Sequence, residues 1–315
     1  MSKDLGVLVG AGFAKWAAGL PIASELFNSE IEPFGHRDAQ RAQLVHRARD
    51  AWLAQHPDGT SEEFIAHALA QDEKLRTAVA WYIMRRLSEP YIWQEWHAGR
   101  WRRHVLMIDE NRKYQRPGVT RARDLLLHLN SALTGIITPN YDLLVEYALG
   151  TQLFNYGRPN EVLSGRGAYP VSQWRNPVTL RGPIVVAKIH GSISWDKAGR
   201  HTDGRGGITG NALIVAPTPE KKPPPELAFE WELAGDILLR SRALLVFGFA
   251  FNPYDEALLA HLRQHGRNLE QVILVDKNPK NDRASALWPH ARLRALSPPP
   301  ENEDLGPWIA NLHRL

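Results

Sequence analysis

The sequence predicts an α/β fold, a doubly wound Rossmann-like parallel sheet with a helical insert domain. Short apolar runs alternate with segments of helical periodicity, which is typical of a parallel sheet covered by helices. The first run, Leu5–Val9, ends directly in Gly10-Ala11-Gly12, the way a dinucleotide-binding unit opens. From residue 38 to 130 the alternation stops, and the chain shows helical patterns with few glycines.

We therefore expect residues 1–37 and 131–315 to form the Rossmann-like domain and residues 38–130 to form the helical insert. Within the insert, Thr60 and Glu63 have the spacing of a capping box at a helix N-terminus. The Trp- and Arg-rich stretch Trp93–Arg103 is interpreted either as bundle core or as an interface, because both residue types are enriched at interface centres.

The α/β alternation resumes after the insert. The predicted helices span 121–133, 143–149 and 229–239, and the predicted strands span 135–138, 184–189, 213–216, 243–247 and 272–275. A further helix is expected to begin with Asn252 as N-cap and Pro253 at its first position, and to stop at Gly266. Two polar loops, 196–210 and 217–225, either contact partners or are simply solvated.

Composition excludes several classes of protein. The 315 residues carry 38 Lys and Arg against 34 Asp and Glu, mixed along the chain, so any role of nucleic acid is expected to be indirect. Cysteine is absent, which excludes disulfides, cysteine zinc sites and a cysteine nucleophile. No apolar run has the length of a membrane span, and the first residues lack a signal-peptide pattern, so we expect a cytoplasmic protein that does not enter the membrane.

The glycine turn is the first candidate for chemistry. Glycines at Gly10 and Gly12 let the backbone turn tightly and approach a pyrophosphate at the N-terminus of the following helix. The full dinucleotide fingerprint is not met, because Lys15 occupies the place of its third glycine. A tight turn without a ligand is the alternative.

Five short motifs, in chain order, make the sequence resemble the sirtuin family. They are Gly10-Ala11-Gly12-Phe13-Ala14 with Gly19-Leu20-Pro21, Thr138-Pro139-Asn140-Tyr141-Asp142, His190-Gly191, Gly248-Phe249-Ala250-Phe251, and Val275-Asp276-Lys277-Asn278-Pro279. Each follows the end of a predicted strand. The resemblance spans residues 10 to 279 and leaves about 38 to 130 unmatched.

The resemblance implies Asn140 and His190 as catalytic residues. It also implies a set of NAD-binding residues: Gly10, Ala11, Gly12, Phe13, Pro21, Thr138, Asp142, Gly248, Phe249 and Asp276. Other roles remain open for four of these residues. Asn140 suits a helix cap and Asp142 a first-turn acid, His190 could be an ordinary loop residue, and Asp276 could be a turn residue.

Departures from the family pattern refine the expected activity. Without cysteine, the zinc module of deacetylase sirtuins cannot exist here, and the chain looks like the sirtuin-like NAD hydrolases of bacterial anti-phage defence. Ala14 and Ala250 stand where the family usually has serine.

The resemblance implies an NAD glycohydrolase that takes NAD as its substrate, uses no metal, and releases nicotinamide and ADP-ribose. It also implies activation by a separately encoded sensor or ATPase partner, by homo-oligomerisation, or by both. The alternatives are an NAD- or ADP-ribose-binding module without catalysis, and an NAD-dependent deacylase or ADP-ribosyltransferase. Hydrolysis and cyclisation of ADP-ribose share the same first bond cleavage, so the sequence favours neither.

Overall fold

The computed structural model describes residues 3–28, 31, 36–97, 100–105, 108, 117–163, 177–196, 199–201, 212–215, 225–300 and 304–313. Within these residues, seven strands form one sheet in the order β15-β14-β13-β1-β4-β8-β5. The strands are β1 (Leu5–Val9), β4 (Leu133–Thr138), β5 (Phe154–Asn155), β8 (Ile184–Lys188), β13 (Ala243–Phe247), β14 (Gln271–Val275) and β15 (Arg292–Leu296). Every neighbouring pair is parallel, as the sequence predicted.

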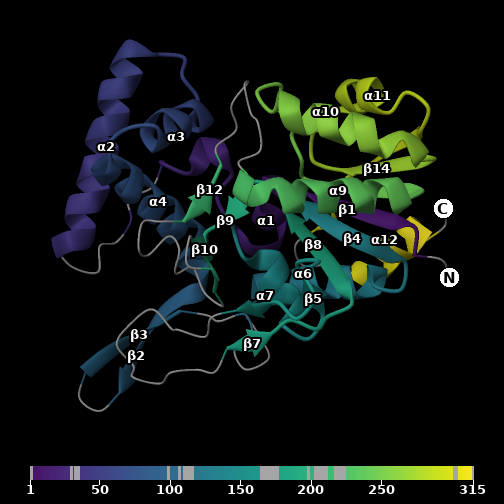
Figure 1. Ribbon diagram of the computed structural model, residues 1–315, viewed down its shortest axis with the longest axis horizontal. Helices are drawn as coiled ribbons and strands as arrows, with labels where there is room; N and C mark the ends of the chain where they lie inside the picture. The colour runs from purple at the N-terminus through teal and green to yellow at the C-terminus, as the bar shows by residue number, and fades with distance from the viewer. Residues whose placement is uncertain are drawn as a thin grey trace.

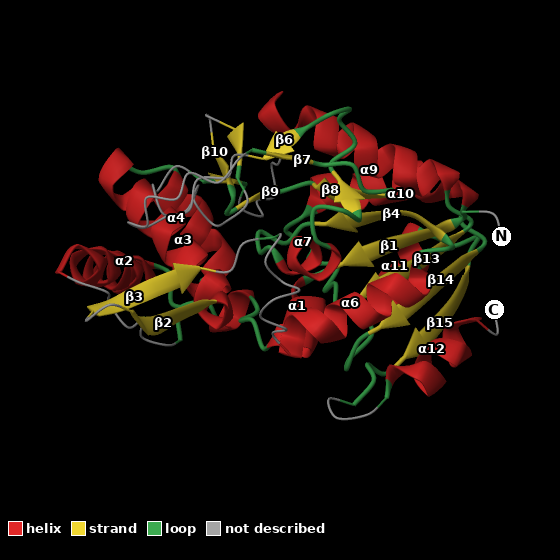
Figure 2. Cartoon of the chain, turned by 90° about the horizontal axis from the view of Figure 1, so that it is seen from below, coloured by secondary structure: helices red, strands yellow, loops and turns green. Residues whose placement is uncertain are grey.

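Helices cover both faces of this sheet. Figure 2 shows α9 (Ala228–Arg240) and α10 (Glu256–His265) along one side, and α1 (Ala11–Ala18), α6 (Pro117–Leu129) and α12 (Leu305–His313) along the other. The central strands β1, β4, β8 and β13 are almost wholly buried, because both of their faces are covered. The doubly wound α/β architecture is therefore confirmed.

The helical region lies beside the sheet (Figure 1) and consists of α2 (His36–Gln55), α3 (Ser61–Leu69) and α4 (Glu73–Ser88). The predicted capping box is present at α3: Thr60 Oγ1 accepts the Glu63 N–H at 3.2 Å, and the Glu63 carboxylate accepts the Thr60 N–H at 2.8 Å. Phe64 and Tyr82 are among the buried side chains of this region, and both rings pack against Phe27.

One part of the predicted all-helical stretch is wrong. Residues 92–105 form an antiparallel hairpin, β2 (Ile92–His97) and β3 (Arg100–Val105), in which Trp96 pairs with Trp101. Aromatic residues are common in strands as well as in the cores of helix bundles, so the tryptophans of this segment did not distinguish a hairpin from a helix. The side chains of the Trp93–Arg103 stretch lie outside the described residues, and its role as an interface stays a prediction.

The helix expected at 121–133 is present as α6 (Pro117–Leu129) and packs mainly on helices that cover the sheet. α6 lies against α1 and against α7 (Leu144–Leu149), and Gly118 comes so close to Ala18 that a Cβ there would lie 2.6 Å from the Ala18 Cβ. The division of the chain at residue 130 stays a proposal.

The helix expected from Asn252 begins later than predicted. α10 starts at Glu256, and Asn252 Oδ1 accepts the Tyr254 N–H at 3.1 Å in a local turn instead. Asn-Pro favours such a turn as strongly as it favours a helix start. The predicted stop at Gly266 is confirmed.

The two polar loops and the strand between them were also predicted. The loops 196–210 and 217–225 lie mostly outside the described residues, and the strand expected at 213–216 is present as β12 (Leu213–Ile214). In the described part of the chain, no helix combines the length and the apolar character needed to span a membrane.

Candidate active site at the carboxyl edge of the sheet

The sheet topology places its switch point between β1 and β13. The chain runs outward from β1 to β4 and β8, then returns to the other side of β1 with β13 and continues to β14. In doubly wound sheets, ligands bind outside the carboxyl ends of the strands at such a point. The segments that follow β1, β4, β8, β13 and β14 all leave this edge, and they carry the five motifs.

The glycine turn after β1 packs directly on the turn after β13. A Cβ on Gly10 would lie 2.4 Å from the Gly248 carbonyl oxygen, and one on Gly12 would lie 2.7 Å from the Gly248 Cα. Gly248 itself has φ 62°, and a Cβ there would lie 2.3 Å from the Phe13 nitrogen. These three glycines are required first of all for contact between two backbones.

Hydrogen bonding within this turn uses part of the helix N-terminus. The Gly12 N–H donates to the Gly248 carbonyl at 2.9 Å, and the Phe13 N–H donates to the Gly10 carbonyl at 3.0 Å. For the Ala11 N–H, the structure shows no acceptor among the described residues. A phosphate at the start of α1 would therefore meet the Ala11 N–H and the positive end of the helix dipole.

The aromatic residues of the motifs serve the core. The Phe13 ring lies 5.3 Å from the Phe247 ring, and the Phe249 ring lies 4.9 Å from the Phe251 ring. Phe13 and Phe249 are both buried, so a nucleotide would meet their backbone rather than their rings. Ala14 is also buried.

The segment after β4 is held by local hydrogen bonds. The buried Thr138 hydroxyl donates to the Val9 carbonyl at 3.0 Å and accepts the Asn140 N–H at 3.0 Å. Asp142 Oδ1 accepts the Leu144 N–H at 2.9 Å in a local turn before α7, and the helix cap itself is Leu143, which makes no side-chain hydrogen bond. For the half-buried Asn140 side chain, the structure shows no hydrogen-bond partner among the described residues.

Asp142 is buried beside a lysine. Burial raises the pKa of its carboxyl, and the nearby Lys188 charge and the Leu144 N–H oppose that rise in part. The carboxyl is thus more easily protonated than an exposed one.

His190 follows β8 and lies beside Asp255, the residue that precedes α10. The imidazole Nε2 is 3.4 Å from Asp255 Oδ2, and the two side chains are only 2% and 6% exposed. Gly191 takes φ 82°, and a Cβ there would lie 1.9 Å from the Leu213 carbonyl oxygen, so the His-Gly pair needs its glycine. The arrangement presents a histidine with a carboxylate partner, as in a general base with an orienting acid.

Sequence reasoning missed Asp255 as a site residue. Asp255 directly precedes α10, whose first-turn acid is Glu256, and lies 65 positions after His190 in the sequence. No local signal in the sequence links the two residues.

Asn140 and His190 are brought together by strand register. Thr138 of β4 pairs with Lys188 of β8, and Asn140 and His190 each lie two residues beyond that pair. The Tyr141 ring lies 6.5 Å from the His190 ring, and its hydroxyl donates to the Val215 carbonyl at 2.8 Å.

The helical region also reaches this edge. Burial raises the pKa of Tyr141, and the carboxylates of Asp255 and Glu62 add to the effect. Glu62 belongs to the first turn of α3.

Asp276 follows β14 and is half-buried. Its Oδ1 accepts the Asn278 N–H at 2.8 Å, and the Gly248 N–H donates to the carbonyl of the preceding Val275 at 2.9 Å. The Asp276 carboxylate therefore belongs to the residue that follows Val275, whose carbonyl group binds the turn at Gly248.

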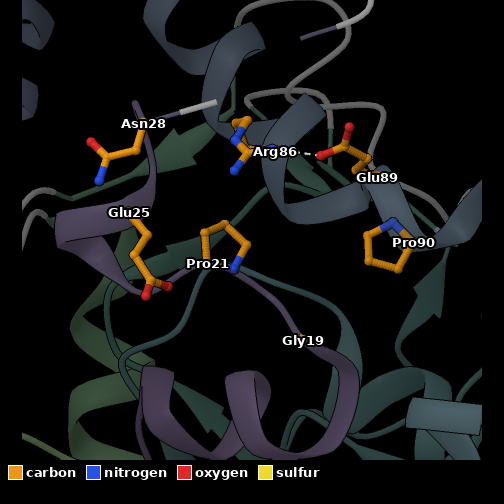
Figure 3. Close-up of a pocket in the computed structure, with 7 residues that line it drawn as sticks. All are labelled: Gly19, Pro21, Glu25, Asn28, Arg86, Glu89 and Pro90. Atoms are coloured by element: carbon orange, nitrogen blue, oxygen red, sulfur yellow. Dashed lines mark hydrogen bonds and ion pairs between the residues drawn. The ribbon is translucent and has the colours of Figure 1, made fainter. Parts of the chain in front are cut away.

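A pocket of about 280 Å³ opens where the sheet domain meets the helical region (Figure 3). It is lined by Gly19, Pro21, Glu25, Asn28, Arg86, Glu89 and Pro90. The largely buried Arg86 donates to the Leu26 carbonyl at 3.0 Å and to the Glu89 carboxylate at 2.6 Å. Pro21, one of the predicted NAD-binding residues, therefore faces a polar cavity.

The described residues contain no cluster of histidine and acidic side chains that could hold a metal ion. Since cysteine is absent from the whole sequence, thiolate ligands are excluded as well.

Comparisons with known proteins find structural similarity at low sequence identity. No protein-family model matches the sequence, and no curated protein matches it. A Sir2 homologue mutant in complex with 2'-O-acetyl ADP ribose is 18% identical, with a TM-score of 0.41 over 99% of this chain and 91% of that one.

Two further solved structures resemble the chain to a similar degree. A Sir2 homologue in complex with NAD is 16% identical over 99% of this chain and 89% of that one, with a TM-score of 0.38. A Sir2 protein bound to a propionylated peptide is 14% identical over 99% and 93%, with a TM-score of 0.40. At this level of similarity the likenesses assign neither a family nor an activity, and the function has to be argued from this chain's own side chains.

Proposed function

We propose that this chain hydrolyses NAD to nicotinamide and ADP-ribose. The observation that carries the proposal is the placement of Asn140 and the His190–Asp255 pair at the carboxyl edge of the sheet, where Asn140 and His190 each follow one of two neighbouring parallel strands. Cleavage of the nicotinamide–ribose bond passes through a cation-like transition state, so the protein must orient NAD, place a water near the anomeric carbon and accept its proton.

Each residue has a role in this proposal. The Asn140 amide orients the water or the ribose. His190, oriented by Asp255, accepts the proton as general base. Asp142, with its raised pKa, contacts the nicotinamide carboxamide.

The rest of the dinucleotide lies across the switch point. The Ala11 N–H and the N-terminus of α1 bind the pyrophosphate next to Gly10, Gly12 and Gly248. Asp276, after β14, accepts hydrogen bonds from the adenosine ribose hydroxyls. The chemistry needs no metal.

The wider role follows the sequence resemblance. We propose an anti-phage defence effector whose activity is held back until a separately encoded partner or self-assembly activates it.

The experiment is chromatography of NAD and its products with the purified chain, beside Asn140→Ala and His190→Ala. The proposal expects the parent to release nicotinamide and ADP-ribose and both variants to lose that activity. Equal NAD loss by all three proteins would overturn the assigned site. No loss by any of them, even after self-assembly or addition of a cognate partner, together with tight NAD binding in calorimetry, would favour a binding module without catalysis.

A further inference from the structure

A fully buried ion pair lies directly behind the candidate site. Lys188 Nζ is 3.0 Å from Glu146 Oε1, and the two side chains are 1% and 0% exposed. The Tyr156 hydroxyl donates to the same Glu146 oxygen at 2.9 Å. The second oxygen, Oε2, is buried and has no hydrogen-bond partner among the described residues.

A buried ion pair of this kind contributes little to the free energy of unfolding. Removing two charges from water is costly, and their attraction repays the cost only where the remaining hydrogen-bonding capacity is also satisfied. Here one carboxylate oxygen of Glu146 is left over. Apolar residues of similar size often fill such a place without loss of stability, so the pair calls for a reason other than stability.

The contacts of Lys188 point to that reason. Its ammonium group also donates to the backbone carbonyl of Asp142, at the end of the segment that carries Asn140. Lys188 is at the same time the last residue of β8, two residues before His190. One side chain therefore connects the two segments that hold the proposed catalytic residues.

Glu146 sets the direction of this side chain. It lies on α7, one turn beyond Asp142, so the helix whose first N–H donates to Asp142 also carries the anion that holds the Lys188 ammonium. Loss of the carboxylate would leave the lysine without its charge partner. Loss of the lysine would leave a buried carboxylate near Asp142.

We propose that Lys188, held by Glu146, is a positioning residue that fixes the Asn140 segment relative to His190. The proposal rests on the proposed NAD hydrolysis. Displacing a catalytic group by about 1 Å can cost about a hundredfold in rate, so a rigid cross-link between the two segments has a direct use.

The test compares two variants with the parent. In Lys188→Met alone, Glu146 stays buried without its partner, and this variant could fail to fold. In the triple variant Lys188→Met/Glu146→Leu/Tyr156→Phe the whole network becomes apolar at similar volume, which protects folding. The control is Leu287→Ala on α11 (Asn281–Leu287), a buried truncation at the far edge of the sheet that touches neither segment.

Two readouts separate positioning from stability. The first is amide hydrogen exchange over residues 139–144, where the Asn140 and Leu144 N–H groups are hydrogen-bonded in the parent. The second is kcat and KM for NAD. We expect the triple variant to melt close to the parent, to exchange about tenfold faster at these amides, and to lose about tenfold to a hundredfold in kcat with KM little changed.

The outcomes distinguish the two proposals. A triple variant with parental exchange and parental kcat would overturn the positioning role, as would equal effects in Leu287→Ala. If the parent itself does not cleave NAD, the proposed function fails. Exchange at residues 139–144 then still decides whether Lys188 holds the segment.

Discussion

His190 Nε2 lies 3.4 Å from Asp255 Oδ2, and the two side chains are almost fully removed from solvent. His190 follows β8, whereas Asp255 precedes α10 on the other side of the switch point. The contact therefore ties the two halves of the sheet together at the edge where we place NAD. It also gives the proposed general base a fixed orientation.

Replacing the carboxylate should slow NAD hydrolysis without preventing folding. Asp255→Asn keeps the shape of the side chain but removes its charge, so the imidazole loses the partner that orients it and stabilises its protonated form. We expect kcat to fall about tenfold to a hundredfold, less than for His190→Ala, because the base itself is still present. Steady-state NAD hydrolysis measures this.

The matched control for that experiment is Asp282→Asn, an exposed first-turn acid of α11. Its activity should equal that of the parent. If Asp255→Asn hydrolyses NAD as fast as the parent, Asp255 does not orient the base and His190 acts alone or not at all.

Asp276 should matter for binding rather than for turnover. Its carboxylate is proposed to accept hydrogen bonds from a ribose far from the reacting bond, and a hydrogen bond to a charged group contributes about 1.5–3 kcal/mol. Asp276→Ala is therefore expected to weaken NAD binding about tenfold to a hundredfold in calorimetry and to leave kcat close to the parental value. A large loss of kcat at unchanged affinity would place Asp276 elsewhere in the mechanism.

The close contact between the turns after β1 and β13 predicts a large stability loss for Gly248→Ala. Gly248 has φ 62°, and its Cβ would lie 2.3 Å from the Phe13 nitrogen. Gly19 has φ 67° but nothing within 4 Å of its Cβ position, so Gly19→Ala carries the backbone strain alone.

Chemical denaturation of both variants separates strain from steric overlap. We expect Gly19→Ala to cost about 1 kcal/mol of unfolding free energy and Gly248→Ala at least about 2 kcal/mol more. Equal losses in the two variants would show that the two turns can move apart at no cost.

Local patterns in the sequence predicted β1, β4, β8, β13 and β14, because each of these strands is an apolar run that ends in glycine or a polar residue. They did not predict the edge strands β5 and β15, of which β5 has only two residues and β15 alternates arginine with apolar residues. They also predicted the capping box of Thr60 and Glu63, whose partners lie three residues apart. What they could not predict are contacts that only the fold creates. Asp255 meets His190 across the sheet, and Lys188 meets Glu146 across two neighbouring segments.

Errors arose where one composition suits two structures. The row of Trp and Arg residues from 92 to 105 forms the β2–β3 hairpin, not a helix, since hairpin pairing depends on the partner strand and not on one segment alone. Asn252-Pro253 forms a turn before α10. The helix cap left open as an alternative role of Asn140 is not observed: α7 has Leu143 as its cap, and Asp142 accepts the Leu144 N–H in a turn before it.

A last prediction concerns stability at mildly acidic pH. Burial, with a smaller effect from the neighbouring His265, lowers the pKa of His261 to about 4, below its ordinary value of 6.5. A histidine whose pKa is depressed in the folded state binds fewer protons there than in the unfolded chain between these two values. The neutral ring thus favours the folded state above pH 6.5, and this contribution is lost as pH falls from 6.5 toward 4.

In His261→Gln, the free energy of unfolding should fall less as the pH is lowered from 6.5 toward 4. Because His261 is only half-buried, we expect the parent to lose about 1–2 kcal/mol more than the variant between pH 7 and pH 4.5 in denaturant unfolding. The exposed His290→Gln serves as the control and should follow the parental curve. If the stability of His261→Gln falls as steeply as that of the parent, carboxylates elsewhere account for the acid sensitivity.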